Sequence, residues 1–165
     1  MSENSEKNRR PMISAVTLCE KYLELSNGAK AELKRVSSLS ELQSKGTFIR
    51  LLAGEDSFVQ YSRVVFILPW LSHKEGISLG SVLYSGYAGH SISEARMVQM
   101  LRSDYPQDII TLRRMIWHAA GRHAEVTVDW EKLGEQLYYW GERNKQKIVQ
   151  DYYLAEARSK KTEGE

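Results

Sequence analysis

Cysteine is almost missing from this sequence of 165 residues, proline occurs three times, and net charge is small. A single Cys19 with four histidines excludes a disulfide framework and argues against a zinc site with several ligands, so we expect no metal or cofactor. The longest apolar run, residues 64–71, contains Pro69 and is far shorter than the ~20 residues needed to span a membrane. The opening residues MSENSEKNRRP include no apolar segment of the kind that directs secretion. We therefore expect a soluble, cytoplasmic protein without a membrane partner.

Alternation of apolar and polar residues, which marks a half-buried strand, is also absent, whereas helical spacing is frequent. In the first predicted helix, apolar residues recur at three- and four-residue intervals: Ile13, Val16, Cys19 and Leu23. Ser38 and Glu41 have the spacing of a capping box, in which a serine and a glutamate satisfy free amides at a helix start. The sequence predicts an all-α protein with about eight to nine helices and no sheet.

The glycine-rich stretch 85–89 is the best candidate for a hinge. It divides the chain into two predicted lobes, each a small helical bundle, over residues 12–85 and 86–157. The helix expected at 58–71 is apolar nearly all round, so we place it at the centre of the first lobe. Residues 1–11 are predicted to be a disordered lead, and residues 158–165 a disordered charged tail.

Positive charge is modest overall and concentrated locally. The net charge is only +2, but segment 27–50 contains five lysines and arginines against two glutamates. At 100° per residue, most basic side chains of the predicted helices point away from the apolar faces. The candidate residues for holding a negatively charged partner are Lys34, Arg35, Arg50, Arg96, Arg102, Arg113, Arg114, Arg143 and Lys147.

Each basic face also has a simpler interpretation, because charged surfaces are the default in helical proteins. Arg113 differs from the others, since it falls among Ile109, Ile110, Ile116 and Trp117. It is either a structural arginine paired with a carboxylate or a ligand for phosphate. The sequence contains no phosphate-binding loop, nucleophile elbow or HExxH motif.

Four blocks of the sequence together resemble a known family. They are LSNGAKAELKRVSSLSEL, GISLGSVL, ISEARMVQMLRSDYPQDIITLRRMIWHA and VDWEKLGEQLYYWGERNKQKIVQDYYL, which cover most of residues 25–154. In this combination and order they resemble the CasB family, the small subunit of Cascade, an RNA-guided surveillance complex of type I-E CRISPR systems. The sequence departs from the family pattern in its longer lead before Pro11, in residues 121–127, and at Glu142, where a basic residue is expected.

The resemblance implies a non-catalytic, all-α, two-lobed subunit that works in antiviral defence. Its implied partners are crRNA, the target DNA strand, the displaced DNA strand, the large and backbone subunits of Cascade, and a second copy of itself. The basic residues would hold nucleic-acid backbones and stabilise the R-loop. The arginines at positions that match the family's motifs are Arg35, Arg96, Arg102, Arg113 and Arg114.

Two functions from other classes remain as alternatives. One is a helical protein–protein adaptor, in which the basic faces only keep the protein in solution. The other is a small enzyme that uses His118 with Cys19 or a carboxylate. The position of Cys19 on the apolar stripe of its helix argues against the enzyme.

Overall fold

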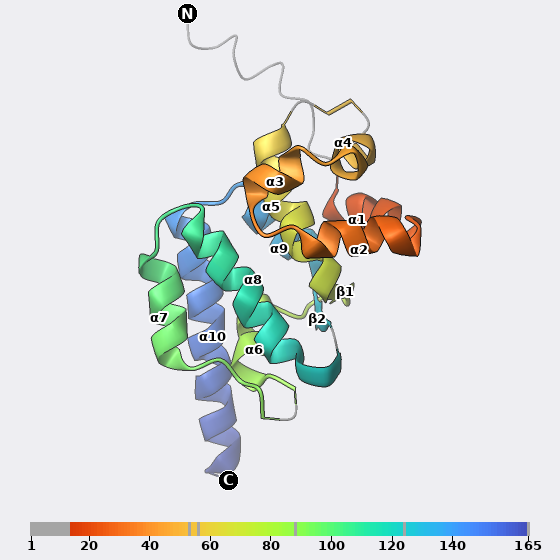
Figure 1. Ribbon diagram of the computed structural model, residues 1–165. Coiled ribbons are helices and arrows are strands. Elements are labelled where there is room, and N and C mark those ends of the chain that lie inside the picture. The colour runs from red at the N-terminus through yellow and green to blue at the C-terminus, as the bar shows by residue number, and fades with distance from the viewer. Residues whose placement is uncertain (1–13, 53, 56, 88, 124, 165) are drawn as a thin grey trace, which may run out of the picture.

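The structure is a computed structural model that describes residues 14–164, apart from residues 53, 56, 88 and 124 (Figure 1). The predicted lead, residues 1–11, lies outside the described residues. The described chain forms ten α-helices: α1 Ala15–Leu23, α2 Asn27–Arg35, α3 Leu39–Gln43, α4 Gly46–Leu52, α5 Phe58–Ile67, α6 Leu79–Ser85, α7 Glu94–Arg102, α8 Gln107–Ala120, α9 Trp130–Tyr138 and α10 Glu142–Glu163. Two short 3₁₀ helices and two strands complete it: η1 Leu68–Trp70, η2 Gly121–His123, β1 Leu71–His73 and β2 Val126–Val128.

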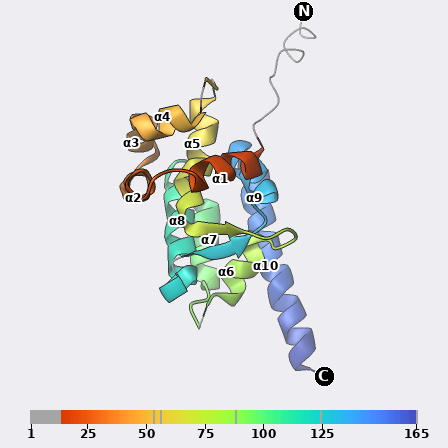
Figure 2. The same ribbon diagram turned by 90° about the vertical axis from the view of Figure 1, so that its right-hand side faces the viewer.

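The prediction of no sheet is wrong, because β1 and β2 pair in parallel (Figure 2). Leu71 lies opposite Val126, and Ser72 lies opposite Thr127 with their hydroxyl oxygens 2.8 Å apart. Each strand has only three residues, which is too short for an alternating pattern to be recognised. The all-α class otherwise holds, with one more helix than the upper end of the predicted range among the described residues.

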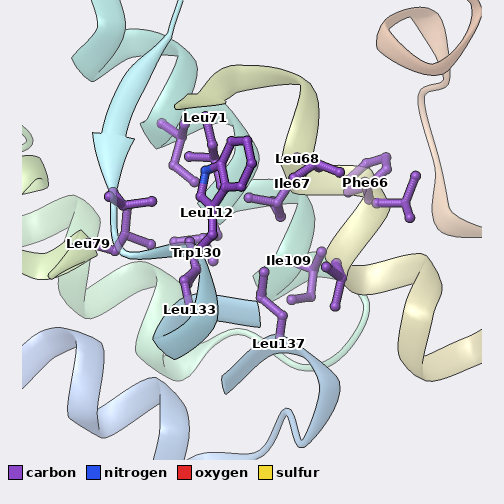
Figure 3. Close-up of a cluster of buried hydrophobic side chains, with 14 of the residues drawn as sticks. Phe66, Ile67, Leu68, Leu71, Leu79, Ile109, Leu112, Trp130, Leu133 and Leu137 are labelled. Atoms are coloured by element: carbon purple, nitrogen blue, oxygen red, sulfur yellow. The ribbon is translucent and has the colours of Figure 1, made fainter. Parts of the chain in front are cut away.

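Helix α5 forms the centre of the first part of the chain, as predicted. It packs against α2, α3, α4, α8 and α9. Tyr61, Val65 and Phe66 on α5 are all buried. The helix ends at Ile67, earlier than predicted, because Pro69 lies in η1 and the chain then enters β1. Figure 3 shows residues of η1, α8 and α9 that belong to the same apolar core, among them Leu68, Leu112 and Leu133.

Helix α10 is the longest element, and its C-terminal turns extend beyond the other helices (Figure 1). It packs closely against α6, where Gly80 leaves no room for a side chain next to the backbone of Ile148 and Tyr152. Residues 158–163, which the sequence predicts as part of a disordered tail, are helical here, since α10 continues to Glu163. An ion pair between Glu156 and Lys160, four residues apart, supports this last part of the helix.

Contacts between distant segments join the two predicted lobes. Helix α9 packs against α1 and α5, and Arg63 on α5 donates a hydrogen bond to the carbonyl of Leu137 at the end of α9 (2.7 Å). Helix α6, which precedes the predicted boundary, packs mainly on α10, which follows it. The division at residue 85 therefore stays a prediction, and the described residues share one continuous core.

Candidate nucleic-acid interface

Arg113 is anchored between two segments of the chain. It extends from α8, and its guanidinium donates hydrogen bonds to the backbone carbonyls of Val36 (2.6 Å) and Lys34 (2.7 Å) at the end of α2. The same guanidinium lies 4.1 Å from the ring centre of Phe66 and 4.3 Å from that of Trp70. Both terminal nitrogens of the guanidinium are therefore bonded within the protein, and its plane lies against two aromatic rings.

The surroundings of Arg113 make it a structural residue. Burial lowers its pKa to about 10, opposed by the nearby carboxylate of Glu41, so the side chain keeps its charge at neutral pH. A structural Arg113 is predicted from the sequence to pair with a carboxylate, but its hydrogen-bond acceptors are carbonyl oxygens. A carbonyl at a helix C-terminus carries partial negative charge, which suits a buried cation. Arg113 thus fixes the end of α2 against α8.

A groove opens beside this anchor. It has a volume of about 360 Å³ and is lined by Arg35, Val36, Ser37, Phe66, Trp70, Ile110, Arg113, Arg114 and Trp117. Arg35 ends α2 and Arg114 follows the anchor on α8, and both side chains are exposed. Two residues that are 79 positions apart in the sequence therefore present their guanidinium groups to the same hollow.

Lys34 adds a third exposed cation next to the groove. Its ammonium lies 5.8 Å from the ring centre of Trp70, which lines the groove. Lys34 itself is exposed on the last turn of α2. The structure thus brings together Lys34, Arg35 and Arg114, which sequence analysis had placed on two separate helices.

The remaining candidates lie on other elements. Arg50 is exposed at the end of α4 and lines a different hollow, together with Lys21 and Thr47. Arg96 and Arg102 are exposed on α7, and Arg102 lines a shallow hollow with Glu94.

The two candidates on α10 differ in their surroundings. Arg143 is exposed near the first turn of the helix. Lys147 is also exposed, but its ammonium pairs with the carboxylate of Asp151 at 3.5 Å. The groove beside Arg113 is therefore the hollow that candidate residues from two different helices line together.

Comparison with known proteins gives the chain a family. The model of the family described as CRISPR-associated protein Cse2 matches residues 29–153, which is most of the chain. The chain belongs to the Cse2 family.

Two relatives extend the comparison over nearly the whole chain. CRISPR system Cascade subunit CasB of Escherichia coli strain K12 is 32% identical over 158 residues, which is 86% of this chain and 94% of that protein. A chain in the crystal structure of E. coli Cascade bound to a PAM-containing dsDNA target has 32% identity and a TM-score of 0.77. That match covers 90% of this chain and 99% of the other. The resemblance to the CasB family that the sequence blocks carry is confirmed.

Two structural features of this Cse2 family member could not be predicted from its sequence. Trp117 was assigned to the apolar surroundings of Arg113, but 64% of its surface is exposed at the groove. Its spacing of three residues from Arg114 is the signal that places it on the same side of α8. Lys145 was not singled out at all, and it is buried in an ion pair with Asp108.

The environment of Cys19 bears on the alternative in which this Cse2 chain is an enzyme. Cys19 lies in the apolar core, and burial raises the pKa of its thiol, so the reactive thiolate is disfavoured at neutral pH. Within the described residues, no three His, Cys, Asp or Glu side chains come together in a way that could hold a metal ion. None of the helices in the described chain has the length and apolar character that crossing a membrane requires.

Proposed function

We propose that this chain is a non-catalytic small subunit of a type I-E Cascade complex, where it binds nucleic-acid backbones and stabilises the R-loop. Membership of the Cse2 family and the similarity to a chain of DNA-bound E. coli Cascade support this proposal. The single observation that carries it is the groove that the exposed Arg35 and Arg114 line beside the anchored Arg113.

The chemistry of this surface suits phosphate. A guanidinium forms paired hydrogen bonds with phosphate oxygens, and Arg35 and Arg114 extend from two helices that Arg113 holds in register. Phosphate contacts supply affinity without reading sequence, as required of a subunit that must work with any guide.

Modest contacts are sufficient for this role. R-loop formation exchanges one duplex for another of similar stability, so a few backbone contacts can shift the equilibrium. We propose crRNA, the target strand and the displaced strand as nucleic-acid partners. The protein partners would be the large and backbone subunits and a second copy of this chain, in the cytoplasm.

Dissociation kinetics of the assembled complex test the proposal. The experiment measures R-loop collapse at two salt concentrations, with two unrelated guides, for complexes that carry Arg35→Ala or Arg96→Ala. Each phosphate contact removed should lower the log–log salt slope by ~0.7–0.9 and speed collapse equally for both guides. Arg158→Ala, an exposed arginine near the end of α10, serves as the matched control.

Two outcomes would contradict the proposal. Normal assembly and unchanged collapse for both variants would favour the adaptor, in which the basic faces only solvate the protein. A loss that depends strongly on the guide would indicate base reading in place of backbone contacts.

A further inference from the structure

Trp117 is unusual because its large apolar ring faces solvent. Its exposed fraction of 64% is the highest among the large apolar side chains of the described residues. The other three tryptophans have partners within the protein: Trp70 lies under Arg113, Trp130 is buried in the core, and Trp140 donates a hydrogen bond to Asp108. Since exposure of an indole forgoes the free energy of burying it, Trp117 has no evident role in folding.

The position of Trp117 combines this ring with free positive charge. Trp117 lies one turn after Arg114 on α8, and both line the groove that Arg35 borders from α2. Arg113 has fewer donors left for a ligand, because backbone carbonyls already accept hydrogen bonds from both of its terminal nitrogens. The groove volume of about 360 Å³ falls within the range of sites for small organic groups.

We propose that this groove is a subsite for one unpaired nucleotide, with its base stacked on Trp117 and the adjoining phosphates held by Arg35 and Arg114. The inference rests on the proposed function and adds a preference for single-stranded nucleic acid. Stacking on an exposed aromatic ring beside basic side chains is how proteins hold single strands without reading their sequence. A base within a duplex is already stacked on its neighbours, so it has no free face for the indole.

The positive charge of the two arginines favours a nucleotide over an apolar peptide as the occupant of the groove. Two guanidinium groups at the rim would be partly desolvated by an uncharged partner without compensation. A nucleotide offers a flat apolar base together with anionic oxygens, which matches both kinds of side chain.

Binding of short oligonucleotides to the full-length chain tests the subsite. The probes are an oligothymidylate of about 12 nucleotides, a strand of equal length with abasic sites throughout, and a blunt duplex. Affinity is measured over a range of salt for wild type, Trp117→Ala, Trp117→Phe, Arg35→Ala and Arg114→Ala. Leu154→Ala, which removes an exposed apolar side chain on α10, is the control.

The expected results distinguish stacking by Trp117 from the charge contacts of the two arginines. Trp117→Ala should weaken oligothymidylate binding by about tenfold or more without changing the salt slope, and Trp117→Phe should restore most of the loss. The tryptophan variants should bind the abasic strand and the duplex as wild type does. The two arginine variants should instead lower the salt slope for every probe.

Each contrary result has a distinct meaning. If Trp117→Ala binds oligothymidylate as wild type does while the arginine variants lower the slope, the stacking subsite is wrong and the proposed function stands. If Trp117→Ala weakens the abasic strand equally, the ring does not contact a base. If none of the variants changes binding, the proposed function fails together with the subsite. Loss of assembly into Cascade by Trp117→Ala with unchanged oligonucleotide binding would make Trp117 a protein contact and overturn the inference.

Discussion

The ammonium of Lys145 lies 3.1 Å from the carboxylate of Asp108, and both side chains are almost completely buried, with exposed fractions of 3% and 2%. Lys145 also donates to the carbonyl of Ser103 (2.8 Å), and Asp108 accepts a hydrogen bond from the indole of Trp140 (2.9 Å). This network joins the start of α10 to the start of α8 and the end of α7. It sets the position of α8, the helix that provides Arg114 and Trp117 to the groove.

Removal of one partner of this pair should be strongly destabilising. Lys145→Met leaves the carboxylate of Asp108 buried without its counter-ion, and we expect a loss of ~3–5 kcal/mol in the free energy of unfolding, measured with denaturant. Lys147→Met is the matched control, since Lys147 is largely solvent-accessible and Asp151 keeps a second basic partner in Lys132, so the loss should be less than ~1 kcal/mol. Adding Asp108→Asn to Lys145→Met should recover part of the loss. Equal effects of the two lysine substitutions would contradict this account.

Substitution of Arg113 should reduce the stability of the fold, whereas substitution of its neighbour Arg114 should reduce nucleic-acid binding. Arg113→Ala leaves two carbonyls without a donor and removes the contacts with Phe66 and Trp70, so we expect a loss of about 2 kcal/mol or more. Arg114→Ala at an exposed position should change stability by less than ~0.5 kcal/mol and still weaken nucleic-acid binding. Thermal melts and R-loop retention of the two variants provide the measurement. Arg113→Lys should recover little stability, because a lysine cannot reproduce the planar fork. Similar melts for both alanine variants would show that the two side chains have been assigned to the wrong environments.

A glycine on α9 is required by the close approach of α1. A Cβ atom at Gly134 would lie 2.1 Å from the Cβ of Ala15, so Gly134→Ala should cost ~1–3 kcal/mol although alanine is the better helix former. The double variant Gly134→Ala with Ala15→Gly removes the overlapping atom and should regain most of the stability. Chemical denaturation of the three variants tests this, and a double variant no more stable than Gly134→Ala would exclude the overlap as the cause.

Stability at acidic pH should depend on Asp129, the N-cap of α9. A hydrogen bond from the amide of Gly76, with further ones from the amides of Lys132 and Glu131, holds the pKa of Asp129 below its ordinary value of 3.8. Because the pKa of Asp129 is lower in the folded than in the unfolded state, its ionised carboxylate stabilises the folded protein above pH 3.8. This contribution is lost as the pH falls through the pKa of the folded state. The difference in stability between wild type and Asp129→Asn should therefore be constant near neutral pH and become smaller below pH 3.8. Thermal melts from pH 7 to 2 measure it, and an advantage that stays constant over that range would refute the prediction.

The helices could be predicted from the sequence because local signals agree with the final packing. Ser38, which the sequence predicts at a helix start, is the N-cap of α3 and accepts a hydrogen bond from the amide of Glu41. The strands could not be predicted, since Leu71–His73 and Val126–Val128 gain their conformation from pairing with each other across 55 residues. The charge pattern predicts disorder at the end of α10, because it does not reveal the ion pair of Glu156 with Lys160 that forms within the helix.

The candidate site was predictable in its residue types and less so in its geometry. Helical angles identified Arg114 as exposed and Arg113 as set among apolar residues, and both assignments match the structure. The acceptors of Arg113 are carbonyls of a segment 77 and 79 residues earlier, which no local pattern specifies. The exposure of Trp117 likewise depends on where α2 ends relative to α8, so only the folded chain defines the groove.

The pairing of β1 with β2 also has a consequence for synthesis on the ribosome. Helices α1 and α5 leave the exit tunnel while β2 and α9, which complete their packing, are still untranslated. At ~5–20 residues per second, about 60 further residues take several seconds. During this time α1 can pack against α4 but lacks its contacts with α9. We therefore expect the nascent N-terminal half to attract chaperones that bind exposed apolar segments until the last quarter of the chain has been synthesised.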